Sequence, residues 1–190
     1  MLSYAEIQRS VQGAWLLAKG DTRGMNLFDL SVEGFWRSFA AMLIVAPVYA
    51  LVLLAQPVPA DSEPESLTGT LLAEAIAYVV GWAAFPIAAV FLTRLLGLAA
   101  GYVPLVVANN WSAVVQIAFY AAVVVLGTLL PGELRALTLL AATLAILVYQ
   151  WFVIRTALDT GGGIALGIVV VDVLLSLAVS RGMDGLLGVG

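Results

Sequence analysis

Residues 164–180 read IALGIVVVDVLLSLAVS, a run in which every side chain is apolar or small except Asp172. As an α-helix rising 1.5 Å per residue, this run extends about 25 Å, which approaches the roughly 30 Å of hydrocarbon in a bilayer. A helix also satisfies its own backbone hydrogen bonds, which lipid cannot do. The run therefore predicts a membrane-spanning helix.

The rest of the chain has the same character, because 63% of its 190 residues are apolar and only 11% are charged. A soluble domain carries roughly 25% charged residues. Four further stretches are long and apolar enough to cross a bilayer, so we predict an all-α polytopic helical bundle over residues 37–182 with a short tail, 183–190. The expected transmembrane helices are 37–55, 71–94, 103–130, 136–156 and 164–180.

The third span is longer than one crossing requires and leaves two interpretations. The simpler one is a single tilted helix over 103–130. The alternative is a re-entrant or interfacial segment through Pro104, with the crossing beginning near Trp111.

The basic residues predict an orientation through the positive-inside rule. Six of the eight fall on the side of the N-terminus: Arg9, Lys19, Arg23, Arg37, Arg94 and Arg155. The acidic residues Asp61, Glu63 and Glu65 fall in the first loop on the other side, which has no basic residue. We expect an integral protein of a bacterial inner membrane, with the N-terminus cytoplasmic and the C-terminus outside.

The first 36 residues are expected to form a cytoplasmic interfacial segment. Residues 3–18 predict an amphipathic helix, in which Ser3 and Glu6 have the spacing of a capping box and Gly20 provides a stop. One interpretation places this helix on the inner membrane face, and the alternative makes it a docking surface for a partner protein. The expected membrane-surface residues are Trp15, Arg9, Lys19, Arg23, Trp36 and Arg37.

Asp172 predicts a polar layer inside the bundle, because an ionisable group is costly at membrane depth. Other polar residues fall at similar depth on the third and fourth spans, and Arg155 is the one cation whose long stem is expected to reach them. The expected cluster consists of Asp172, Asn109, Asn110, Gln116, Gln150 and Arg155. Such a cluster either holds helices together by hydrogen bonds or forms a path for a solute, ion or proton.

The composition excludes several kinds of chemistry. The chain has no cysteine and no histidine, so disulfides, thiolate metal sites and histidine-based catalysis are absent. Asp172 is alone at its depth, so no aspartyl pair is expected, and no lysine lies within a span. We expect no enzyme activity, catalytic residue, metal or cofactor, and the net charge of −4 argues against nucleic acid.

Five spans behind a cytoplasmic amphipathic leader resemble the layout of the Yip1-like membrane proteins. Gly101, Tyr102 and Pro104 are similar to a Gly-Tyr/Pro grouping in that family. Of the Asp-Leu-Tyr-Gly-Pro signature of its eukaryotic members, only Asp29 and Leu30 are present. The resemblance implies a role in membrane organisation or trafficking and no catalytic residues.

Two functional hypotheses follow. The first is a non-enzymatic protein of membrane organisation, trafficking or complex assembly. Its expected partners are the lipid bilayer and a membrane protein or a second copy, to which the GxxxG spacing of Gly163 and Gly167 is suited. The alternative is a small transporter or channel built around Asp172. A stable companion protein would favour the first, and a cavity that reaches Asp172 would favour the second.

Overall fold

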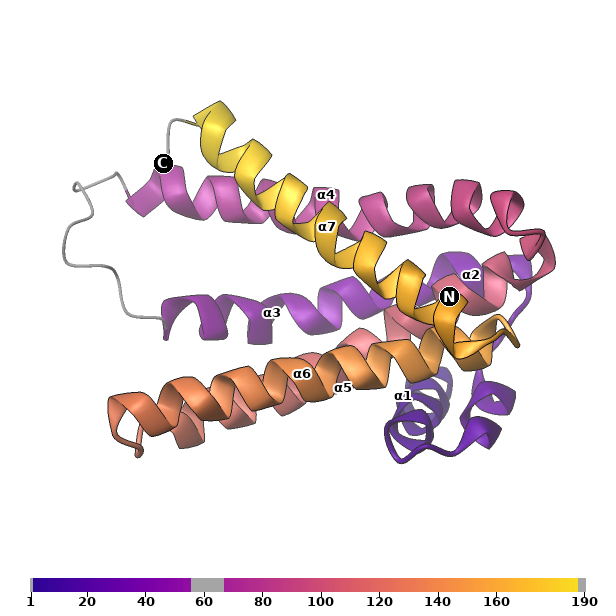
Figure 1. The fold of residues 1–190 in the computed structure, drawn as a ribbon, viewed down its shortest axis with the longest axis horizontal. Helices are drawn as coiled ribbons and strands as arrows, with labels where there is room; N and C mark the ends of the chain where they lie inside the picture. Colours follow the sequence, from indigo (N-terminus) through magenta and orange to yellow (C-terminus); the bar gives the residue numbers. More distant parts are fainter. Residues whose placement is uncertain (1, 56–66, 188–190) are drawn as a thin grey trace.

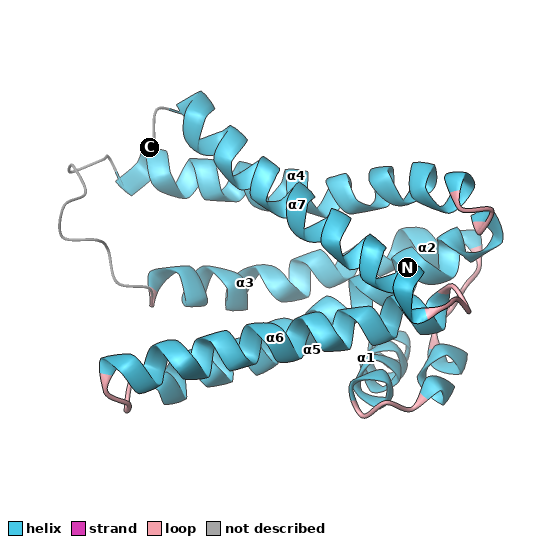
Figure 2. Ribbon diagram, in the orientation of Figure 1, coloured by secondary structure: helices cyan, strands magenta, loops and turns pink. Residues whose placement is uncertain are grey.

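A computed structural model describes residues 2–55 and 67–187, with side chains over 2–55 and 72–182. Seven α-helices and two short 3₁₀ helices account for most of these residues, with no strand among them (Figure 2). The elements are α1 (Tyr4–Ala18), η1 (Thr22–Leu27), α2 (Val32–Ser38), α3 (Ala40–Leu54), α4 (Leu67–Leu95), η2 (Ala99–Gly101), α5 (Tyr102–Gly127), α6 (Gly132–Ala157) and α7 (Gly162–Leu187). The predicted all-α class is confirmed.

Five apolar segments have the length and composition to cross a membrane, so the chain is an integral membrane protein. They are Val32–Leu54, Leu72–Leu95, Ala99–Gly127, Gly132–Ala157 and Gly162–Gly182. The third is one helix, α5, entered through the turn η2, so the re-entrant alternative does not describe it. The expected tail at 183–190 differs from the structure, in which α7 continues to Leu187.

The first span starts earlier than predicted and is interrupted. Ser31 caps α2 by accepting a hydrogen bond from the amide of Gly34, so helix begins at Val32 rather than at 37. Near the end of α2, the Ser38 hydroxyl donates to the carbonyl of Phe35 at 2.7 Å. Such side-chain bonds to the preceding turn compete with the helical ladder and bend it, which explains the break at Phe39.

The spans form two layers. Helices α3, α5 and α6 pack together in one layer, and α7 packs across α4 in the other. The layers approach each other at the end that carries α1 and α2 and diverge toward the opposite end (Figure 1). The fully buried side chains follow this pattern: Leu105, Ile154 and Ile168 all lie in the halves of their helices nearest the N-terminal segment. The packed core is therefore at one end of the bundle.

The N-terminal segment is docked on this packed end. Helix α1 contacts α5 and α6, and its residues Ala14 and Leu17 are fully buried. The hydroxyl of Tyr149 on α6 donates to the carbonyl of Ala14 at 2.7 Å. Tyr4 and Trp15, on the same helix, are exposed. The helix thus uses part of its apolar face to cover the bundle.

Ion pairs hold the same segment to the first span. Arg37 on α2 donates through Nε to Glu6 at 2.8 Å and through Nη2 to Asp29 at 2.5 Å. Glu6 therefore does not complete the expected capping box, although Ser3 does cap α1 by accepting from the Glu6 amide. Hydrogen bonds from Ser31 and the nearby Arg37 guanidinium hold the pKa of the Asp29 carboxyl below its usual value.

Two glycines let α1 and η1 cross closely. A Cβ placed on Gly13 would lie 2.8 Å from the carbonyl oxygen of Gly24, and one on Gly24 would collide with the carbonyl of Gly13. Backbone atoms cannot move aside as the tip of a flexible side chain can. This pair of glycines was not singled out by the sequence pattern, because it becomes a contact only after the chain turns at Gly20.

We predict that Gly24→Ala destabilises the N-terminal segment by about 1–3 kcal/mol, the usual cost of overpacking. Faster trypsin cleavage after Lys19 and Arg23 would report the loosening, together with a lower thermal midpoint in detergent. Gly132→Ala is the matched control, because a Cβ there meets no atom within 4 Å. Equal cleavage of wild type and Gly24→Ala would contradict the prediction.

Candidate functional site

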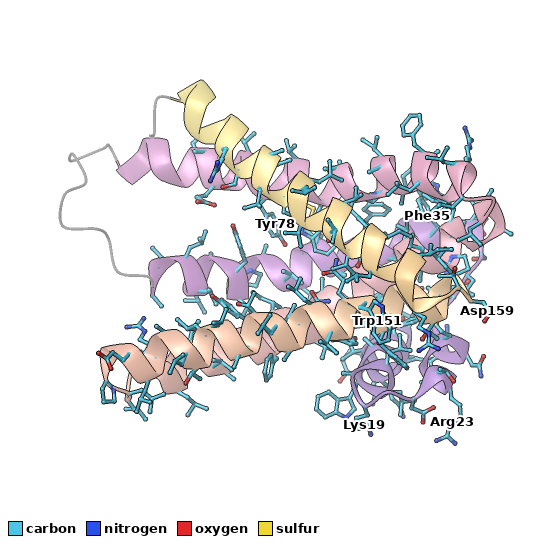
Figure 3. All side chains as sticks on the ribbon, viewed as in Figure 1. Lys19, Arg23, Phe35, Tyr78, Trp151 and Asp159 are labelled. Atoms are coloured by element: carbon cyan, nitrogen blue, oxygen red, sulfur yellow. The ribbon has the colours of Figure 1, made fainter. Side chains whose placement is uncertain are left out.

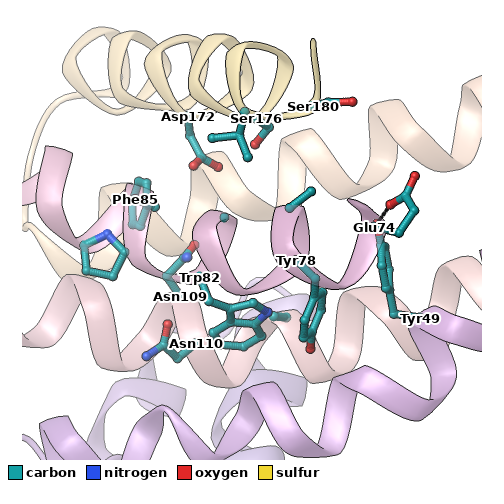
Figure 4. Close-up of a pocket in the computed structure, with 15 residues that line it drawn as sticks. Tyr49, Glu74, Tyr78, Trp82, Phe85, Asn109, Asn110, Asp172, Ser176 and Ser180 are labelled. Atoms are coloured by element: carbon teal, nitrogen blue, oxygen red, sulfur yellow. Dashed lines mark hydrogen bonds between the residues drawn. The ribbon is translucent and has the colours of Figure 1, made fainter. Parts of the chain in front are cut away.

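A cavity of about 390 Å³ lies between the two layers, bounded by α3, α4, α5 and α7 (Figure 4). Its lining combines carboxyl, amide, hydroxyl and aromatic side chains with small residues. The lining residues are Tyr49, Glu74, Ala77, Tyr78, Gly81, Trp82, Phe85, Pro86, Asn109, Asn110, Ala113, Asp172, Ser176, Val179 and Ser180.

Helical periodicity places these residues on shared faces. On α7, Asp172, Ser176 and Ser180 follow each other at intervals of four, so they form one polar stripe toward the cavity. On α4, the lining residues likewise recur at intervals of three and four from Glu74 to Phe85. A Cβ placed on Gly81 would meet no atom within 4 Å, so this glycine leaves open space where a larger side chain would fill it.

Asp172 lies at the deep end of the cavity. It is ten residues into α7, which is about 15 Å from the start of the helix and close to the middle of the span. The Gln150 side chain on α6 donates through Nε2 to Oδ2 of Asp172. Just beyond, toward the N-terminal segment, Ala89, Leu105 and Ile168 are at most 2% exposed, so the packed core closes the cavity at this end.

Glu74 lies at the other end of the cavity. The hydroxyl of Tyr49 on α3 donates to Oε2 of Glu74 at 3.1 Å, which links α3 to α4 (Figure 4). Glu74 is near the start of its span, Tyr49 is near the end of α3, and Ser180 is near the end of its span. The cavity therefore extends from mid-membrane toward the end of the bundle opposite the N-terminal segment.

An aromatic wall connects the two ends. The rings of Tyr49 and Tyr78 stack with centroids 5.0 Å apart, and the rings of Tyr78 and Trp82 meet at 6.1 Å. The Tyr78 hydroxyl donates to the carbonyl of Met42 at 2.6 Å, which fixes its ring between the two layers (Figure 3). Phe85 continues the wall below Asp172.

The structure brings together some of the expected cluster. Asp172 bonds Gln150, while Asn109 and Asn110 line the cavity. The Asn110 amide, however, donates to Ser38 Oγ at 2.9 Å, so it joins α5 to α2.

The structure does not bring Arg155 or Gln116 to Asp172. The Arg155 guanidinium lies 5.4 Å from the centre of the Trp151 ring and is exposed. Five residues at 100° each place Arg155 about 140° around α6 from Gln150, so it was wrong to expect its side chain in the layer. Gln116, seven residues after Asn109 on α5, is not among the residues that line the cavity.

Glu74, Tyr49 and the aromatic wall were missed. A usable signal existed: Glu74, Tyr78, Trp82 and Phe85 recur at intervals of four, four and three, which puts them on one helix face.

The expected membrane-surface residues divide into two groups. Trp15 and Trp36 are 55% and 68% exposed, and Arg9 is also exposed. Lys19 and Arg23 are exposed as well (Figure 3). The Lys19 ammonium lies 5.9 Å from the Trp15 ring, and Arg23 pairs with Asp21 at 2.6 Å. The Arg23 contact lowers the pKa of the Asp21 carboxyl to about 2. Arg37 is not free for lipid, because Glu6 and Asp29 already pair with it.

No protein-family model, curated protein or solved structure shows a significant match to this chain. The fold and the cavity define its class: a five-span α-helical membrane protein with a cavity between its helices that is lined by polar, aromatic and small side chains.

Proposed function

We propose that this protein is a small transporter or channel that admits a solute or proton to Asp172 through the cavity. The main observation in support of this proposal is that the Asp172 carboxyl group, at mid-membrane, lines a cavity of about 390 Å³. Intramembrane carboxyls that face a cavity mark solute, ion and proton paths. This is the feature that separates the transport hypothesis from a purely structural role for Asp172.

The hydrogen bonding around Asp172 supports this choice. A carboxylate offers about four acceptor sites, and within the described residues only Gln150 uses one of them. A group that served helix packing alone would be enclosed by partners, because an unsatisfied charge in a low-dielectric interior is costly. The remaining acceptor sites of Asp172 are available to water, a proton or a solute.

The one-sided access to the cavity favours a transporter over a permanently open channel. The core around Leu105 and Ile168 separates Asp172 from the end that carries α1. A transporter needs a second conformation that opens this end and closes the other. We propose no catalytic step, because the cavity offers neither a nucleophile–base pair nor a partner carboxyl near Asp172.

The orientation we propose is N-terminus inside, in a bacterial inner membrane, so that the cavity faces outward. Six basic residues lie at the packed end, and only Arg135 and Arg181 lie at the other. The positive-inside rule puts the first group in the cytoplasm. The acidic loop residues Asp61, Glu63 and Glu65, which fit this orientation, lie outside the described residues.

The native chain has no cysteine, so single cysteines test this orientation directly. We expect Thr128→Cys, in the turn between α5 and α6, to react with an impermeant maleimide in intact cells. Thr22→Cys, in η1, should react only after the membrane is permeabilised. The reverse pattern would overturn the orientation.

We predict that Asp172→Asn removes most proton flux, at least tenfold, from reconstituted vesicles. The amide keeps the shape of the side chain and a hydrogen bond to Gln150 but cannot exchange a proton. Vesicles loaded with a pH-sensitive dye, under a potassium-diffusion potential, provide the measurement. Glu133→Gln is the control, since it removes an exposed acid that lies outside the cavity, at the end of the bundle toward which the cavity extends.

Two results would overturn proton transport through Asp172. One is a wild-type proton flux no faster than that of protein-free vesicles. The other is an undiminished flux in Asp172→Asn. If Asp172→Asn instead lowers the thermal midpoint with flux per folded protein unchanged, Asp172 has a packing role.

A role in membrane organisation is the second candidate, favoured by a separate observation. The N-terminal segment exposes the large aromatic side chains of Tyr4, Trp15 and Trp36, the kind of residues that bind interfaces and partners. The Yip1-like resemblance supports the same role. Copurification of a companion that is lost in Trp15→Ala, with no vesicle flux in wild type, would favour this candidate over transport.

A further inference from the structure

We infer that the solute bound in the cavity is a monovalent organic cation with an apolar body, such as a substituted amine or quaternary ammonium. This inference rests on the proposed solute cavity and adds the chemical class of its ligand. Its evidence is the charge of the lining, the separation of the two carboxyls, and the aromatic wall between them.

The lining contains acidic side chains and no basic side chain. Glu74 and Asp172 are the ionisable acids of the cavity, and neither lysine nor arginine occurs among the lining residues. The nearest basic residue in sequence, Arg181, follows Ser180 and is outside the lining. A cavity with low-dielectric walls and one sign of charge concentrates ions of the opposite sign. No cationic side chain of the lining would balance the negative group of an anion or a zwitterion.

The two carboxyls are too far apart to share a small metal ion. Glu74 and Phe85 mark the two ends of the α4 face, and eleven residues correspond to roughly 16 Å along the helix. Figure 4 places Asp172 beside Phe85 and the Tyr49–Glu74 pair at the opposite end. Divalent cations require about six oxygen ligands close together, and no group of three acidic side chains occurs within the described part of the chain.

The volume and the aromatic wall fit an organic cation. Small-molecule sites typically have volumes of about 300–1,000 Å³, and this cavity has about 390 Å³. The hydroxyls of Tyr49 and Tyr78 are already bonded to Glu74 and to the Met42 carbonyl. These rings are therefore held in place and offer π surface and not hydroxyl groups, which suits a cation of low hydration.

The parts have separate tasks in this arrangement. Glu74, near the outer end, attracts the cation, and Asp172 balances its charge at mid-membrane. Tyr78, Trp82 and Phe85 contact the apolar body. Asn109 and Ser176 provide neutral polar groups that neither repel the cation nor compete with the carboxyls for its charge.

Equilibrium binding of two ions of nearly identical shape tests the charge selectivity. Tetraphenylphosphonium should bind the purified full-length protein saturably, whereas tetraphenylborate should not. We expect Asp172→Asn to weaken tetraphenylphosphonium binding at least tenfold, Glu74→Gln and Trp82→Ala threefold to tenfold, and Glu133→Gln not at all. Gly81→Leu should weaken binding by filling the cavity without changing its charge.

A smaller probe covers the case in which the tetraphenyl ions do not enter. Ser176→Cys should react faster with trimethylammonioethyl methanethiosulfonate than with the anionic sulfonatoethyl reagent. The ratio of the cationic to the anionic reaction rate should be higher at Ser176→Cys than at the exposed control Thr128→Cys. Adding Asp172→Asn to Ser176→Cys should lower this ratio toward the value of the control.

The outcomes separate this inference from transport itself. Equal binding of both tetraphenyl ions, or equal reagent ratios at positions 176 and 128, would overturn cation selectivity. Flux that depends on Asp172 would then still support the transport proposal. Selective cation binding without any flux would support the ligand class and overturn transport.

Discussion

The carboxyl group of Asp172 lies about 15 Å along its helix, where bilayer hydrocarbon offers neither water nor counter-ions. Much of the surrounding structure serves to accommodate this group. The side chain must be neutralised, paired or given access to water. Gln150 provides one hydrogen bond, and the cavity gives access to the remaining oxygen sites. The divergence of α4 and α7 from the other layer leaves space for this cavity. The cavity also stays open because no large side chain fills the space beside Gly81.

A bundle whose layers diverge at one end must be held firmly at the other. Here the core around Leu105, Ile154 and Ile168 is continuous with the buried face of α1. Lipid tails are as apolar as the buried side chains, so the hydrophobic effect contributes little to the association of helices within a membrane. Hydrogen bonds between the helices therefore add specificity to their packing. Tyr149 is an example, since its hydroxyl donates to the Ala14 carbonyl and also shares a hydrogen bond with Ser112 at 2.9 Å. One side chain thus joins α6, α5 and α1.

The sequence predicted features that depend on length and depth, and it failed on those that depend on direction around a helix. Apolar run lengths identified five spans, and depth alone placed Gln150 level with Asp172. Depth did not reveal that Arg155 points away from Gln150 around α6, or that Glu74 and Trp82 share a face with Phe85. Likewise, the amphipathic pattern of residues 3–18 predicted a helix that the structure contains. The apolar face of such a helix can pack equally well on a membrane surface or on the end of a helical bundle. Only the close crossing of Gly13 and Gly24 and the contacts of Ala14 distinguish these two packings.

The packed end and the cavity are connected through Asn110. This residue lines the cavity, yet its amide bonds Ser38, whose hydroxyl in turn donates to the carbonyl of Phe35. Arg37, adjacent in sequence to Ser38, pairs with Glu6 of α1. Hydrogen bonds and an ion pair therefore connect α1 through α2 to a residue that lines the cavity.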